Sequence, residues 1–162
     1  MTGFNVQVDD SAVRLRFEEL PGKVRTRLVI AVNKLTILMQ AYVRGQKLAG
    51  QVLNYHTHHL QQAIQREVNE TDTAVIGTVF VNESLAPYGA IHEFGGTIPG
   101  HEIVATKAAA LAFLWHGKQA FFKRVYIPDV HMPERSYLRS SLQDKRDDIV
   151  SEITEAVKGG TQ

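Results

Sequence analysis

The sequence predicts an α+β domain, in which a mixed, mainly antiparallel β-sheet of about four to five strands is packed by a long N-terminal helix and a C-terminal helix. Three observations support this class. Apolar residues recur at spacings of three and four near both ends of the chain, which is the period of one helix face. Between these regions, short runs rich in β-branched and aromatic residues are separated by Gly, Asn and Pro. The length of 162 residues suits a single domain with its own core.

The first two predicted elements are an N-terminal arm over residues 1–12 and a long helix over residues 20–45. In the arm, three apolar residues alternate with polar ones, a pattern typical of a strand that can pair with another chain. In the helix, the apolar surface is wider than the single stripe needed to cover one core. We therefore expect subunit contacts at six candidate interface residues, Phe4, Val6, Val8, Val29, Ile30 and Ile37.

The middle of the chain, residues 64–127, is the predicted sheet region. It follows a predicted loop over residues 47–54 and a short helical turn that Thr57 is placed to cap. Residues 64–81 are predicted to form a β-hairpin, and residues 88–94 a helical turn stopped by glycine. A second hairpin is predicted around Gly117, with a helical turn at residues 107–111 as an alternative. Pro133 then opens the last predicted helix, over residues 133–158.

Composition excludes several kinds of site and partner. The chain has no cysteine, so disulfides, thiolate chemistry and Cys-based metal sites are excluded. Its 18 Lys and Arg nearly balance its 17 Asp and Glu, so overall charge favours neither a nucleic-acid nor a membrane partner. No apolar stretch approaches the roughly 20 residues that cross a bilayer, and the first residues lack a signal-peptide pattern. We therefore expect a soluble protein that is made in the cytoplasm.

The charges are distributed unevenly along the chain. From residue 14 to residue 47 only Glu18 and Glu19 oppose eight basic residues, Arg14, Arg16, Lys23, Arg25, Arg27, Lys34, Arg44 and Lys47. Such a segment is typical of a solvated helix face, and it also leaves open a nucleic-acid-binding role for the first helix.

Two His-Glu pairs in the stretch from residue 88 to residue 103 raise the question of a metal site. A zinc protease helix places a second histidine four residues after the first, but Gly96 stands at that position after His92. His101 and Glu102 lack the second histidine as well. Three composite metal sites stay open as alternatives. The first is the site of a metal-dependent hydrolase that uses His92, Glu93 and His101, and the second consists of His92, His101 and His131. The third is the cluster His56, His58 and His59. The residues favour a structural role for His92 and Glu93, with no catalytic group, metal or cofactor.

Three segments resemble, in order and spacing, the phage virion-morphogenesis and tail-completion (head–tail joining) proteins. They are GQVLNYHTHHLQQAI, APYGAIHEFGGTIPG and FFKRVYIPDVHMPERSYLRSSL. The residues that match the family pattern are Thr57, Leu60, Ile64, Tyr88, His92, Glu93, Phe94, Gly95, Gly96, Pro133, Arg135, Ser136, Tyr137 and Leu138. His58 and Ala63 stand where the family has glycine and serine. We refer to the matching residues below as the signature residues.

The resemblance extends from about Val43 to Leu142 and implies a small structural subunit without catalytic activity. It implies a place in the virion, at the neck or the head-proximal end of the tail, with the host cytoplasm as the site of assembly. The sixfold symmetry of tails implies a homo-oligomeric ring, a hexamer. The implied partners are phage connector or stopper proteins and the tail tube or tail terminator, with DNA passing through the ring without sequence-specific binding. The sequence therefore leads us to expect a structural virion protein of a tailed phage or prophage.

Overall fold

A computed structural model describes residues 22–54 and 57–160 of the chain. The predicted arm at residues 1–12, with Phe4, Val6 and Val8, lies outside the described residues, as does His56. In chain order the elements are α1 (Gly22–Tyr42), the π-helical η1 (Val43–Gln51), α2 (His59–Ala63), β1 (Ile64–Glu70), β2 (Val75–Val81), α3 (Gly89–Phe94), β3 (Gly96–Ile98), β4 (His101–Val104), β5 (Leu111–Trp115), β6 (Lys118–Phe122), β7 (Arg124–Ile127), β8 (Val130–Met132), α4 (Leu138–Asp144) and α5 (Arg146–Gly160).

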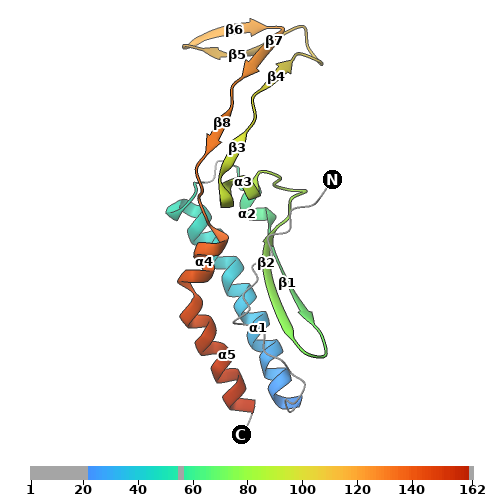
Figure 1. Cartoon of the computed structure of the whole chain (residues 1–162), viewed down its shortest axis with the longest axis vertical. Helices are drawn as coiled ribbons and strands as arrows, with labels where there is room; N and C mark the ends of the chain where they lie inside the picture. The colour runs from blue at the N-terminus through green and yellow to red at the C-terminus, as the bar shows by residue number, and fades with distance from the viewer. Residues whose placement is uncertain (1–21, 55–56, 161–162) are drawn as a thin grey trace.

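The elements form a body and a projecting β-ribbon (Figure 1). The body contains all the helices and the β1–β2 hairpin. The β-ribbon, which we define as residues 96–132, contains β3 to β8 and extends away from one end of the body. The α+β class, with a long first helix and a helix near the other end, is thereby confirmed.

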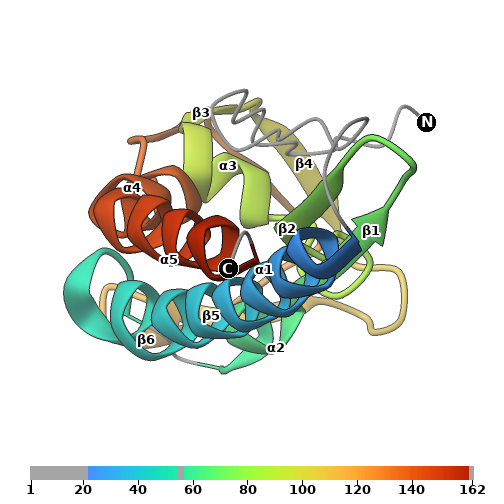
Figure 2. The same cartoon turned by 90° about the horizontal axis from the view of Figure 1, so that it is seen from below.

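In the body, α1 lies between α5 and the β1–β2 hairpin (Figure 2). α1 and α5 run antiparallel, since Lys34 near the middle of α1 pairs with Glu152 of α5, and Val24 near its start lies against Gly160. On the other side, the backbone of Gly77 in β2 comes so close to α1 that an added Cβ would lie 2.5 Å from the Thr36 side chain. Glycine is therefore what allows the hairpin to pack this tightly on the helix.

Two groups of buried residues hold the body together. One group joins α1 to the hairpin and α5, and its buried members are Val24, Leu28, Val32 and Val75. The other lies at the end nearer the β-ribbon, where its buried members are Val43, Leu48, Leu53, Ile64, Tyr137 and Leu138. The second group joins residues from both ends of the chain, so closing it fixes α4 against α1 and β1.

The strands form four separate two-stranded antiparallel ladders, β1–β2, β3–β8, β4–β7 and β5–β6, in place of the predicted single sheet of four to five strands. β1–β2 is the predicted hairpin over residues 64–81, and β5–β6 turns at His116 and Gly117, which both have positive φ. The apolar run that the sequence shows after Gly117 is divided at Lys123. Its second part, β7, pairs with β4 instead of extending β5–β6.

Several boundaries also differ from the prediction. Helical backbone continues past Tyr42 as far as Leu48, where a loop was predicted from residue 47, and Lys47 and Leu48 are buried against the body. Ala49 and Gly50 then leave the helical conformation. The last helical region begins at Leu138, not at Pro133, and is divided at Lys145 into α4 and α5. The alternative helical turn at residues 107–111 is absent, because these residues form bends and the start of β5. In the described parts of the chain, no helix has the length and apolar character of a membrane span.

Candidate functional site

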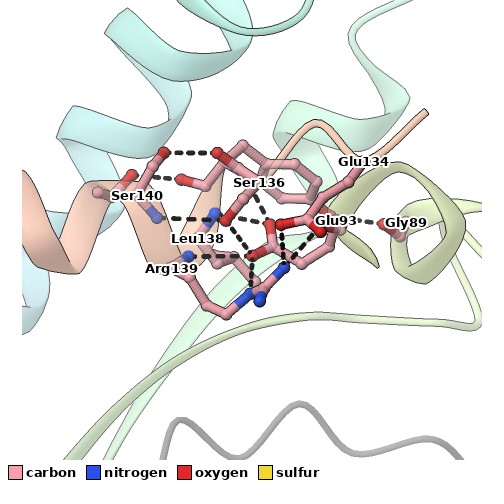
Figure 3. A network of polar contacts seen from close by, with 9 residues as sticks. Gly89, Glu93, Glu134, Ser136, Leu138, Arg139 and Ser140 are labelled. Atoms are coloured by element: carbon pink, nitrogen blue, oxygen red, sulfur yellow. Dashed lines mark hydrogen bonds and ion pairs between the residues drawn. The ribbon is translucent and has the colours of Figure 1, made fainter. Parts of the chain in front are cut away.

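Three of the signature residues, Glu93, Ser136 and Leu138, meet where the end of α3 contacts the beginning of α4 (Figure 3). Glu93 is fully buried, and its carboxylate accepts hydrogen bonds from the backbone amides of Tyr137 and Leu138, both at 2.8 Å, and of Arg139, at 3.0 Å. The first amides of a helix have no partner within the helix, and the N-cap residue of α4, Tyr137, makes no side-chain capping bond. A carboxylate from a distant segment therefore caps α4, where the helix dipole also favours a negative charge.

The contact is reciprocal, because residues before and within α4 bind the carbonyls of α3. The backbone amide of Arg135 donates to the His92 carbonyl at 2.9 Å, and the Tyr137 hydroxyl donates to the Gly89 carbonyl at 3.0 Å. The Arg139 guanidinium donates to the Glu93 carbonyl at 3.1 Å. Each helix thus supplies the hydrogen-bond partners that the other lacks.

The buried charge of Glu93 is compensated by Arg139. The guanidinium Nε lies 3.1 Å from the Glu93 carboxylate, while another guanidinium nitrogen reaches Glu134 at 2.8 Å. The same guanidinium lies over the Phe94 ring, 4.6 Å from its centroid. Ser136 adds a hydroxyl donor to Glu93 at 2.8 Å. Removing this carboxylate would leave several donors without their partner.

Gly95 and Gly89 allow α3 and the residues around the beginning of α4 to approach each other closely. Gly95 has φ +69° and ψ −172°, a conformation essentially restricted to glycine. An added Cβ there would lie 2.7 Å from the Glu134 amide nitrogen. At Gly89 an added Cβ would lie 2.8 Å from the Val81 side chain and 3.2 Å from the Tyr137 hydroxyl. The predicted stop of the helical turn by glycine at residue 95 is confirmed, and its reason includes this close backbone contact.

The surroundings shift the pKa of two titratable groups near Glu93, Tyr137 and His92. Burial raises the pKa of Tyr137 well above its usual value, and the negative charge of Glu93 adds to this effect. Burial also lowers the pKa of His92 below 6.5, and the positive charge of Arg135 lowers it further. The His92 ring makes an edge contact with Tyr88, with centroids 5.8 Å apart. His92 is thus favoured in its neutral form in the folded chain.

The residues of the alternative metal sites lie in different surroundings in the structure. Glu93 is completely buried and surrounded by donors, so its carboxylate has no access to a water molecule or substrate. His101 lies exposed on β4 in the β-ribbon, with Nδ1 3.2 Å from the Pro99 carbonyl. His131, on β8, forms a side-chain hydrogen bond with Thr97 on β3. Among residues 22–54 and 57–160, no three His, Asp or Glu side chains are grouped as a metal site would require. The hydrolase arrangement of His92, Glu93 and His101 is therefore not assembled.

The other signature residues are distributed around this contact. Ile64, Tyr137 and Leu138 belong to the second buried group, and Leu60 packs against it. Gly96 begins β3, while Pro133 and Arg135 are exposed in the extended segment before α4. Thr57 is exposed and does not cap α2, because the capping position is His58 and no side chain makes the capping bond.

The candidate interface residues on α1 divide into two kinds. Ile30 and Ile37 are exposed, at 63% and 48% of their surface. Val29 is partly buried and packs within the chain against the group that contains Val24 and Leu28. Val29 lies on the side of α1 that faces the β1–β2 hairpin, because Arg25 and Thr36, which share this side, contact the hairpin.

Sequence reasoning missed two charged groups of the body. Arg139, which holds Glu93, follows the last signature residue directly and has no pattern that singles it out. Lys47 was assigned to a loop, yet its side chain is only 5% exposed, with its ammonium 2.7 Å from the Asp144 carboxylate. The hydrogen bond from Lys47, and then that from Tyr42, lower the pKa of Asp144. The spacing of four from Val43 to Lys47 would have indicated that both lie on one buried helix face.

Comparison with protein-family models, with curated proteins and with solved structures finds no match to this chain. The class that fold and site define is therefore an α+β protein in which Glu93 of the His-Glu-Phe-Gly-Gly stretch caps a distant helix.

Proposed function

We propose that this chain is a structural virion protein of a tailed phage or prophage that completes the tail or joins it to the head as a subunit of a homo-oligomeric ring. Its role is assembly and not catalysis. The proposal rests on the order of the three signature segments and on one feature of the structure, the β-ribbon.

The β-ribbon is the observation that carries the proposal. From Phe94 to Ser136, no residue whose exposure is described is buried. Large apolar side chains are exposed along it, including Leu114 at 76%, Tyr126 at 66% and Phe121 at 64%. Isolated two-stranded ribbons are marginally stable in water, and contiguous exposed apolar surface marks interaction sites. The ribbon therefore fits a segment that is covered by another protein in an assembly.

The β5–β6 ladder is apolar on both of its faces. Alternation along paired strands places Leu111, Phe113 and Phe122 on one face and Leu114 and Phe121 on the other. Phe113 and Phe122 stack with centroids 5.5 Å apart. A ladder that packed on its own body would need only one apolar face. A ladder with two apolar faces suits insertion between two proteins. These would be neighbouring chains of a ring, or a ring and its docking partner.

The partners we propose are further copies of this chain, a hexamer by analogy with tail symmetry, together with connector or stopper proteins and the tail tube or tail terminator. Closed rings are built from heterologous contacts, in which one patch meets a different patch on the next subunit. A ribbon on one end of the body and exposed helix faces elsewhere satisfy this geometry.

Nucleic-acid binding through the first helix is less well supported by the contacts. Four of its basic side chains are already engaged: Arg25 binds the Thr71 and Asp72 carbonyls, Lys34 pairs with Glu152, Arg44 binds the Ile64 carbonyl, and Lys47 is buried against Asp144. Their charges serve the fold, which leaves little of the segment to contact phosphates.

The test is electron microscopy and light scattering of the purified protein, compared with the variant Leu114→Ser/Phe121→Ser. We expect rings of constant subunit number for the unchanged chain and loss of rings for the variant, with the helical signal of the body retained. A monomer that forms no ring at high concentration and does not associate with phage particles would overturn the proposal.

A further inference from the structure

The outer face of α1 is the second large apolar surface that the chain leaves uncovered. We define this face by Lys23, Arg27, Ile30, Lys34, Ile37 and Leu38, which are all exposed and follow the helical period. Its three aliphatic residues are exposed at 63%, 48% and 54%. α5 and the β1–β2 hairpin cover the other sides of α1. α5 also reaches the edge of this face, where Lys34 pairs with Glu152 and Arg27 lies against Gly159, but it leaves the three aliphatic side chains exposed.

The charge of this face restricts what can cover it. Residues 22–51 contain no Asp or Glu, and the face itself contains Lys23 and Arg27 besides Lys34, which is paired with Glu152. A second copy of the same face would bring like charges together, which is unfavourable. The tip of a second β-ribbon is excluded by the same reasoning, because residues 103–128 contain basic residues and no acidic ones. The occupant must combine apolar side chains with negative charge.

The N-terminal segment of this chain has that combination. Phe4, Val6 and Val8 alternate with polar residues, and Asp9 and Asp10 follow directly, with no basic residue among the first ten. The exposed face of α5 carries acidic residues as well, but Val150 is its one large exposed apolar residue among those described. The N-terminal segment is therefore the better complement in both apolar character and charge.

The length of chain is sufficient for this contact. Residues 11–21 connect the segment to Gly22 and span roughly 35 Å when extended. At 1.5 Å per residue, Leu38 lies about 24 Å along α1 from Gly22. Asp9 and Asp10 can therefore reach any basic residue of the outer face within one chain, and equally the face of an adjacent copy.

We infer that the outer face of α1 is the docking site of the N-terminal segment, residues 4–10, with Phe4, Val6 and Val8 on Ile30, Ile37 and Leu38, and with Asp9 and Asp10 near the basic residues. Docking within one chain needs no oligomer, so the inference stands apart from the proposed virion role. In a ring, exchange of the segment between copies would link each subunit to its neighbour.

Disulfide trapping tests this inference directly, because the chain has no cysteine of its own. The test variant is Val6→Cys/Ile37→Cys, and the matched control is Val6→Cys/Ser151→Cys, since Ser151 is exposed on α5 away from this face. Under mild oxidation of the full chain we expect the test pair to form its disulfide at least about tenfold faster than the control.

The products identify how the segment docks. On a non-reducing gel, a product that migrates as a monomer indicates docking within the chain, and a covalent dimer indicates exchange between copies; both support the site. Adding Asp9→Lys/Asp10→Lys to the test variant should slow trapping several-fold, and this effect should diminish in high salt. Equal trapping rates for the test and control pairs would overturn the inference.

Discussion

The body and the β-ribbon of this protein are built on opposite principles. In the body, residues distant in sequence are brought together to bury Leu28, Ile64, Tyr137 and their neighbours, and even a carboxylate, Glu93, is buried with its full set of donors. In the ribbon, strands pair only with each other and no described side chain is buried. The difference indicates that the body is stabilised by its own tertiary contacts, whereas the ribbon depends on the pairing within its ladders.

The largest expected effect is at the Glu93 carboxylate, which joins α3 to the beginning of α4. Glu93→Ala removes the cap of α4 and leaves Arg139 and several amides without their partner. We expect the free energy of unfolding to fall by about 3–5 kcal/mol, measured by urea unfolding followed by circular dichroism. Glu134→Gln is the matched control, because it removes an exposed partner of the same Arg139 and should cost less than about 1 kcal/mol. Similar losses in both variants would contradict the capping role.

The body and the ribbon can be compared with one truncation in each. Leu28→Ala creates a cavity among buried residues and should lower the free energy of unfolding by about 2–5 kcal/mol. Phe121→Ala removes an exposed ring and should leave the monomer's stability within about 0.5 kcal/mol. Both are measured by thermal and urea unfolding at low protein concentration. A large loss for Phe121→Ala in the monomer would mean that the ribbon packs on its own body.

The junction between the two regions depends on Gly95. Gly95→Ala forces a side chain into a glycine-only conformation and against the Glu134 backbone, so we expect a loss of about 1–3 kcal/mol. Gly45→Ala is the matched control, because nothing lies within 4 Å of its added Cβ and its φ is not in the positive range. Limited proteolysis at residues 133–137 measures whether the junction loosens. Equal resistance of the two variants would contradict the role of Gly95.

The smallest effect is a pH dependence from His92. Burial and Arg135 lower the pKa of His92 below 6.5, so the unfolded chain binds this proton more readily than the folded chain does. The stability that this group contributes is therefore present above pH 6.5 and is lost as the pH falls through the folded pKa. Unfolding measured between about pH 7.5 and 5.5 should show this loss in the unchanged chain and not in His92→Gln. Parallel pH profiles of the two proteins would exclude the effect.

Local patterns predicted many individual elements of this fold. The helical period of α1, the hairpins at residues 64–81 and around Gly117, and the helical turn ending before Gly95 all depend on neighbouring residues, which the sequence displays directly. The His-Glu-Phe-Gly-Gly stretch was also predicted to be structural, because glycine stands where a second metal ligand would be needed. Its connection to α4 was not predicted, since Arg139 and the amides it involves follow no local pattern.

The sequence by itself therefore determined the α+β class, the nature of most elements and the absence of cysteine chemistry. Only the tertiary structure decided that the strands form four separate ladders, that six of them make a ribbon outside the body, and that Glu93 caps a helix more than forty residues away. The physical reason is that strand pairing, burial and capping are decided by contacts between distant residues. A strand's period of two shows which residues share a face, but it does not show which strand lies beside it.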